Sequence, residues 1–128
     1  MGREFEYTVK KKITEEEITN IIVDGLEGGI TYWAMLHNDT PEFEEYYKDK
    51  NLATAEIVAK IILNGGSVKI TDNEEDVEPE YDLTLDRLLV GIQKNAEERP
   101  YDCDLENYDA TTCDCIIQYA IFDEVVFG

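Results

Sequence analysis

Apolar and polar residues alternate near the beginning of the chain. Phe5, Tyr7 and Val9 occupy every second position, and the residues between them are polar. Because neighbouring side chains of a strand point to opposite faces, a period of two is typical of a half-buried strand. The pattern predicts a first strand over residues 5–11.

The spacing changes to that of a helix at residue 14. Thr14 and Glu17 match the capping box, in which two polar side chains satisfy backbone N–H groups at a helix start. The apolar residues that follow recur at intervals of three and four, namely Ile18, Ile21, Ile22 and Leu26. We therefore predict a helix from residue 14, and we expect Gly28 and Gly29 to end it.

Residues 30–36 are apolar on both faces, and their periodicity fits either a central strand or a buried helical turn. Both interpretations place Trp33 in the core. Further along, short strand patterns at residues 67–71 and near residues 81–83 flank an acidic stretch. This arrangement predicts a hairpin.

Helical spacing returns in four later segments. We expect a short helix that opens with Pro41, a helix over residues 53–63, a helix that Thr84 caps and that runs to about residue 98, and a helix that starts near Asp109 or Thr111. The third of these should turn an apolar face inward, formed by Leu85, Leu88, Leu89 and Ile92. Residues 125–127 are apolar and should dock on the body of the protein.

These elements predict an α+β fold in one domain that spans residues 1–128. We expect a small antiparallel sheet of about three strands, covered by four or five helices. A chain of this length is typical of one domain, and the absence of regular strand–helix alternation argues against a parallel sheet.

The charge of the chain restricts the possible ligands most strongly. The chain has 30 acidic and 11 basic residues and a net charge of −19, while its hydrophobic content of 43% favours a folded protein over a disordered one. Two stretches hold no cation at all, one between Lys69 and Arg87 and one after Arg99. DNA, RNA and anionic membranes are bound mainly through cationic surfaces. The sequence therefore argues against all three as direct ligands.

The segregated carboxylates predict a surface that resembles the phosphate track of a nucleic acid and that binds a basic protein surface. Two tyrosines among these acids are candidate interface anchors. The predicted partner-binding residues are Asp72, Glu74, Glu75, Asp76, Glu78, Glu80, Tyr101, Asp102, Asp104, Glu106 and Tyr108. The alternative is a solvated acidic surface that only keeps the protein in solution.

Parts of the acidic stretches have the 1-3-5 spacing of a calcium loop, at residues 72–76 and 102–106. Both lack the glycine at the sixth position and the glutamate at the twelfth that such a loop requires. Cys103, Cys113 and Cys115 do not have the paired spacing of a zinc site, and we expect buried free thiols. The sequence predicts no metal and no cofactor.

Catalytic motifs are lacking. The single histidine, His37, has no recognisable nucleophile motif, so the sequence predicts a protein that is not an enzyme. The first residues lack the apolar core of a signal peptide, and no later run approaches the roughly 18 apolar residues of a membrane span. An odd number of cysteines does not suit a secreted disulfide scaffold, so we expect a cytoplasmic protein.

Three stretches carry a resemblance to a known group of proteins. They are residues 26–33, residues 81–85 with Gly91 downstream, and residues 114–122 with the final 125–128. In these stretches the chain resembles a family of small acidic proteins from phages, plasmids and Gram-positive gut bacteria. The resemblance implies a mobile-element setting and carries no catalytic residues. By analogy of setting, such proteins often inhibit CRISPR or restriction systems, some by imitating nucleic acid.

The leading hypothesis is therefore a non-enzymatic acidic protein of a phage or mobile element that inhibits a nucleic-acid-binding defence protein in the host cytoplasm. One alternative is a binding module for a small ligand or a phage protein, with an apolar pocket near Tyr32, Trp33 and Met35. Another is an enzyme that uses clustered carboxylates with magnesium. The sequence leaves the partner's identity and the oligomeric state open.

Overall fold

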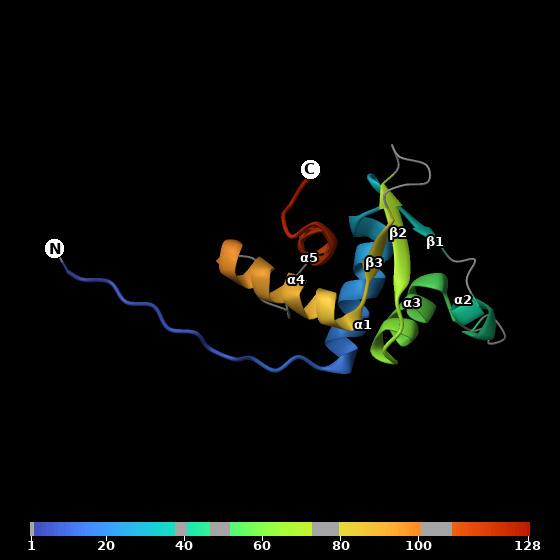
Figure 1. Cartoon of the computed structure of the whole chain (residues 1–128), viewed down its shortest axis with the longest axis horizontal. Coiled ribbons are helices and arrows are strands. Elements are labelled where there is room, and N and C mark those ends of the chain that lie inside the picture. The colour runs from blue at the N-terminus through green and yellow to red at the C-terminus, as the bar shows by residue number, and fades with distance from the viewer. Residues whose placement is uncertain (1, 38–40, 47–51, 73–79, 101–108) are drawn as a thin grey trace.

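The structure is a computed structural model of the chain that describes residues 2–37, 41–46, 52–72, 80–100 and 109–128 (Figure 1). Its elements in chain order are α1 (Glu15–Asp24), η1 (Gly25–Gly29), β1 (Ala34–His37), α2 (Pro41–Tyr46), α3 (Thr54–Leu63), β2 (Val68–Asp72), β3 (Tyr81–Leu83), α4 (Leu85–Glu98) and α5 (Ala110–Phe122). A three-stranded antiparallel sheet with five α-helices in the described residues confirms the predicted α+β class.

Residues 2–13 form an extended arm without secondary structure, so the prediction of a strand over residues 5–11 is wrong. Figure 1 shows the arm leading away from the rest of the protein. Its apolar side chains are exposed, Phe5 by 77% and Tyr7 by 89%. A strand needs a neighbour to pair its backbone groups, and no described strand lies beside the arm. The third strand of the sheet is β1 instead.

Helix α1 begins as predicted. The Glu17 backbone N–H donates to Thr14 Oγ1 at 3.1 Å, and the Thr14 N–H donates to Glu17 Oε1 at 3.2 Å, which completes the capping box. The helical coil ends at Gly28 and Gly29 as predicted, but its last turn is wider than an α-helix, because α1 stops at Asp24 and the π-helix η1 continues to Gly29. A Cβ at Gly29 would lie 2.7 Å from the Ala110 carbonyl oxygen. This glycine therefore allows η1 and α5 to approach closely.

Strand β2 is the centre of the sheet, with β1 on one side and β3 on the other. Ala34 lies opposite Asp72, and Ile70 lies opposite Tyr81. The β2–β3 pairing confirms the predicted hairpin. Residues 30–36 contain both predicted features in part: the Ala34 N–H donates to the Ile30 carbonyl oxygen at 2.9 Å and closes a turn, and β1, which is an edge strand and not a central one, begins at Ala34. The Trp33 side chain is buried, as both interpretations predicted.

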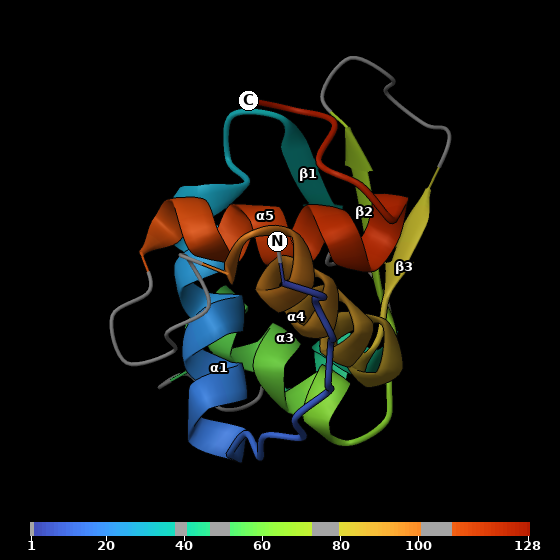
Figure 2. The same ribbon diagram turned by 90° about the vertical axis from the view of Figure 1, so that its left-hand side faces the viewer.

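Helix α5 is the central helix of the fold. It contacts α4, η1, α1 and β3, and Figure 2 shows it crossing the molecule between them. Nearly every residue of α5 is buried, so it has no solvent-facing side. Cys113 and Cys115 lie on it as buried free thiols, which confirms the prediction for these two residues, and Cys103 lies outside the described residues.

The inward face of α4 differs from the predicted one at Leu89, whereas Leu85 and Ile92 pack against the core as predicted. Leu88 is fully buried, but Leu89 is 39% exposed, and the remaining buried positions are Gly91 and Asn95. A Cβ at Gly91 would lie 2.4 Å from the Ile116 carbonyl oxygen, so α4 contacts the backbone of α5 directly at this glycine. This close contact sets the rotation of α4 and turns Leu89 outward.

Candidate functional site

The structure describes two residues of the predicted acidic site. Asp72 is the last residue of β2, and Glu80 directly precedes β3, so these two acids lie where the acidic stretch leaves and rejoins the sheet. Glu80 is exposed and Asp72 is partly exposed. The other nine predicted residues lie outside the described part of the chain, namely Glu74, Glu75, Asp76, Glu78, Tyr101, Asp102, Asp104, Glu106 and Tyr108.

The base of the hairpin holds a charge pair. Lys69 Nζ lies 2.5 Å from Asp82 Oδ1, and the two residues face each other across β2 and β3. The hydrogen bond from Lys69 lowers the pKa of Asp82 below its usual range, and the same bond raises the pKa of Lys69. Lys69, the cation nearest to the start of the acidic stretch, is therefore paired with Asp82, which is not one of the predicted partner-binding residues.

Three acids near the end of the chain have structural roles. Asp109 caps α5, and the backbone N–H of Thr112 donates to it at 2.9 Å and lowers its pKa. Asp123 ends α5 in the left-handed conformation with φ of 67° and pairs with Lys94 at 2.5 Å. Asp114 is 5% exposed. Part of the cation-free stretch after Arg99 therefore stabilises the fold.

Asp114 is the centre of a buried polar cluster that the sequence analysis missed. The Tyr32 hydroxyl donates to Asp114 Oδ2 at 2.6 Å, and Trp33 Nε1 donates to Oδ1 at 2.7 Å. Gln118 Nε2 donates to the same Oδ1 at 2.9 Å. A buried carboxylate with three donors is satisfied, because hydrogen bonds replace the water that it loses on folding.

Gln118 extends this cluster to the end of the chain. Its Oε1 accepts hydrogen bonds from the backbone N–H groups of Val126 and Phe127, both at 2.8 Å. The Phe127 ring stacks on Trp33 with centroids 4.9 Å apart and planes at 8°. The predicted docking of residues 125–127 is thus correct for Phe127, whereas Val125 and Val126 remain 38% and 54% exposed.

This packing bears on the alternative of an apolar pocket near Tyr32, Trp33 and Met35. Phe127 covers a face of the Trp33 ring, and Met35 is 48% exposed. A hollow of about 520 Å³ lies beside the cluster, lined by Gly29, Tyr32, Thr111, Asp114 and Gly128 among others. Its lining is mixed, with a carboxylate and a phenol, so the described residues do not form an apolar pocket there. Ligand binding by this protein stays a prediction.

One sequence signal could have revealed the cluster. Asp114 and Gln118 are four residues apart and interrupt an otherwise apolar stretch of α5. Residues at this spacing lie on the same side of a helix, so two polar groups within a buried helix indicate an internal network. Their partners Tyr32 and Trp33 are more than 80 positions away, and no local pattern connects them.

Spectrophotometric titration should distinguish Tyr32 from the other seven tyrosines. Burial of its hydroxyl and the hydrogen bond to Asp114 raise the pKa of Tyr32 to about 12, although 56% of the residue is exposed. Because the folded-state pKa exceeds the ordinary value of 10.0, the neutral hydroxyl stabilises the fold below about pH 10, and that stabilisation disappears as the pH rises to about 12.

The variant Tyr32→Phe is the control for this titration. The increase in phenolate absorbance near pH 12 should be smaller than that of the parent by the contribution of one tyrosine. The free energy of unfolding should fall less steeply than that of the parent between about pH 10 and 12. Loss of a tyrosine that titrates near pH 10 would contradict the assignment.

The remaining chemistry of the described residues is sparse. His37 Nε2 lies 2.9 Å from Thr71 Oγ1 and so links β1 to β2. Within the described ranges, no three histidine, cysteine, aspartate or glutamate side chains are grouped as a metal site. None of the described helices has the length and apolarity needed to cross a membrane.

Comparison with protein-family models, curated proteins and solved structures finds no match to this chain. The family resemblance therefore stays a prediction. The three stretches that carry it do meet in space. Tyr32 and Trp33 from the first stretch bond to Asp114 in the third, and Gly91 downstream of the second packs on Ile116. The third stretch forms most of α5, and the first two pack against it.

Proposed function

We propose that the protein is a non-catalytic acidic binding protein of a phage or mobile element. It inhibits a nucleic-acid-binding defence protein in the host cytoplasm by occupying the basic groove that normally holds nucleic acid. The observation that carries this proposal is the acidic stretch that starts at Asp72 and ends at Asp82. It holds seven acids and no cation, and the two strands of a hairpin hold its ends.

The sheet supports the proposal because it anchors both ends of this stretch. Ile70 on β2 and Leu83 on β3 are fully buried, and the two strands are paired directly before and after the acids. Anchoring of both ends reduces the conformational entropy that is lost when the acids bind a partner. The dense negative charge of this stretch also raises the association rate with a cationic groove through long-range attraction.

The proposed contact residues are those of the predicted acidic site. Acids at residues 72–80 contact the groove, the acids at residues 102–106 extend the contact, and Tyr101 and Tyr108 are the aromatic anchors. The three structural acids Asp109, Asp114 and Asp123 are not part of it, since their carboxylates are engaged within the fold.

Charge reversal at the hairpin should weaken binding to the partner. The variant Glu74→Lys/Glu75→Lys/Asp76→Lys places three cations against the cationic groove, and we expect its affinity to fall by roughly tenfold or more. The tagged protein is used to capture partners from a lysate of a Gram-positive bacterium, and captured proteins are identified by mass spectrometry. A nucleic-acid-binding protein that both salt and added duplex DNA release is the expected result.

The matched control reverses three exposed acids elsewhere. Glu27→Lys/Glu44→Lys/Glu45→Lys changes the net charge by the same amount on η1 and α2, and it should retain the partner. Equal loss in both variants would show that only the total charge matters. Retention by the hairpin variant, or a partner that duplex DNA does not displace, would overturn the proposal.

A further inference from the structure

The extended arm at residues 2–13 differs in charge from the rest of the chain. It contains four of the 11 basic residues, namely Arg3, Lys10, Lys11 and Lys12. With Glu4 and Glu6 its net charge is +2, so the remainder of the chain, at a total of −19, carries −21. The arm is therefore a cationic segment attached to a strongly anionic body.

The arm also exposes apolar side chains in a regular pattern. Phe5, Tyr7 and Val9 are 77%, 89% and 58% exposed, and they alternate with polar residues along an extended backbone. An extended segment presents every second side chain to one side, so these three form a single apolar edge. Several large apolar side chains exposed together indicate an interaction site.

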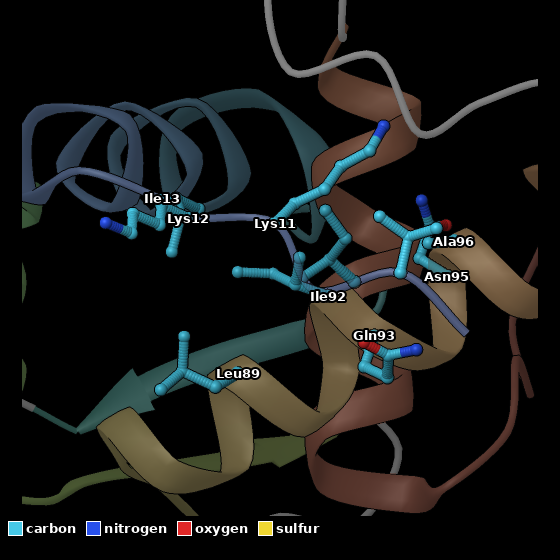
Figure 3. Close-up of a pocket in the computed structure, with 10 residues that line it drawn as sticks. Lys11, Lys12, Ile13, Leu89, Ile92, Gln93, Asn95 and Ala96 are labelled. Atoms are coloured by element: carbon cyan, nitrogen blue, oxygen red, sulfur yellow. The ribbon is translucent and has the colours of Figure 1, made fainter.

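A groove lies between the base of the arm and α4. It has a volume of about 330 Å³, and Figure 3 shows Ile13 on the arm and Leu89, Ile92 and Ala96 on α4 around it. Val9, Lys11 and Lys12 of the arm also line the groove. Leu89 is 39% exposed on this face of α4. Pockets of about 300 Å³ and above are large enough for a ligand-sized group.

The arm does not fill its own groove. Only its residues from Val9 onward line the groove, and Figure 1 shows the preceding residues continuing past the end of α4 and away from the body. Phe5 and Tyr7 are thus presented to another molecule. A second copy of this chain presents the same apolar side chains of α4 to this edge, and the net charge of −21 on its body attracts a cationic segment.

We propose that two copies of the chain exchange their arms, so that Phe5 and Tyr7 of each copy occupy the groove beside Leu89 and Ile92 of the other. Each copy has one arm and one groove, which permits a closed dimer with twofold symmetry. Arg3, which lies over the Phe5 ring, then contacts the anionic second copy, while Lys11 and Lys12 stay beside the groove of their own copy. This dimer uses residues other than the acidic hairpin and does not depend on the proposed function.

Sedimentation equilibrium of the full chain at about 0.15 M ionic strength tests the exchange. We expect a concentration-dependent dimer with twice the chain mass of 14.7 kDa. Phe5→Ser/Tyr7→Ser and, separately, Leu89→Glu should each raise the dimer dissociation constant by roughly tenfold or more. Because all three side chains are exposed, these variants should keep the circular dichroism of the parent. The control Met35→Ser, at an exposed apolar residue outside the groove, should leave the dimer intact.

Disulfide trapping identifies which surfaces meet. One preparation carries Phe5→Cys and the other carries Leu89→Cys, and oxidation of the mixture should yield a cross-linked heterodimer at a higher level than either preparation alone. The parent, which keeps its own cysteines, gives the background. A monomeric parent at about 100 µM, or a dimer that neither the arm variant nor the groove variant weakens, would overturn the proposal.

Discussion

Substitution of Gly91 with alanine is expected to destabilise the fold by about 3 kcal/mol or more. A Cβ at this position would lie 2.4 Å from the carbonyl oxygen of Ile116 and 2.9 Å from the backbone nitrogen of Ala120. Both atoms belong to the backbone of α5, which cannot move aside as a flexible side chain can. The higher helix propensity of alanine, worth about 1 kcal/mol, offsets only part of this effect. Urea denaturation followed by circular dichroism measures the difference.

Gly28→Ala is the matched control for this prediction. A Cβ at Gly28 would meet only the Ala110 Cβ, at an ordinary contact distance of 3.6 Å. We expect this variant to be neutral or stabilised by up to about 1 kcal/mol, since alanine restricts the unfolded chain. A Gly91→Ala protein as stable as the parent would contradict the close contact between α4 and α5.

Substitution of Asp114 with alanine should have the second large effect, a loss of about 3 kcal/mol in the free energy of unfolding. The change leaves the buried Trp33 Nε1–H without its acceptor and removes one acceptor from Gln118. It also loosens the cluster that holds residues 126–127. Fluorescence of Trp33, the single tryptophan, reports directly on this site during denaturation.

Two further variants make the Asp114 test specific. Asp24→Ala removes the same charge from an exposed position at the end of α1 and should change stability by less than about 0.5 kcal/mol. A double-mutant cycle that combines Asp114→Ala with Trp33→Phe should give a coupling free energy of about 1.5 to 3 kcal/mol. Unfolding of these variants is followed by circular dichroism. Additive effects would show that Asp114 and Trp33 do not interact.

The two proposals about partners depend on different parts of the chain. The inhibitor proposal rests on the acidic stretch between β2 and β3, and the dimer rests on the arm and α4. A variant that loses binding to the defence protein should therefore still form the dimer, and a monomeric variant should still bind the defence protein. If arm exchange occurs, each dimer presents two copies of the acidic stretch, and linked copies can bind a partner with two sites more tightly.

Much of the fold was predictable because its signals are local. The cap at Thr14, the proline at residue 41 and the cap at Thr84 each marked a helix start that the structure confirms. The hairpin was recognisable from two short apolar runs around an acidic stretch, and β2 and β3 pair there. Such features depend on residues a few positions apart, which a single sequence displays directly.

The errors and omissions share a different cause. Residues 5–11 alternate like a strand, but alternation does not supply the neighbouring strand whose backbone groups must be bonded. Leu89 has the spacing of a buried residue, yet the contact between Gly91 and α5 rotates it outward. Of the candidate site, the sequence indicated the acidic stretch but not the cluster around Asp114.

By itself, the sequence determined the class of the fold, most helix starts and the segregation of negative charge. These properties follow from composition and from side chains within one or two helical turns of each other. The tertiary structure alone decided that Asp114 is buried, that Phe127 covers Trp33 and that none of the described strands pairs with the arm. Each of these depends on which distant segments pack together, because burial and hydrogen bonding are settled only when the whole core assembles.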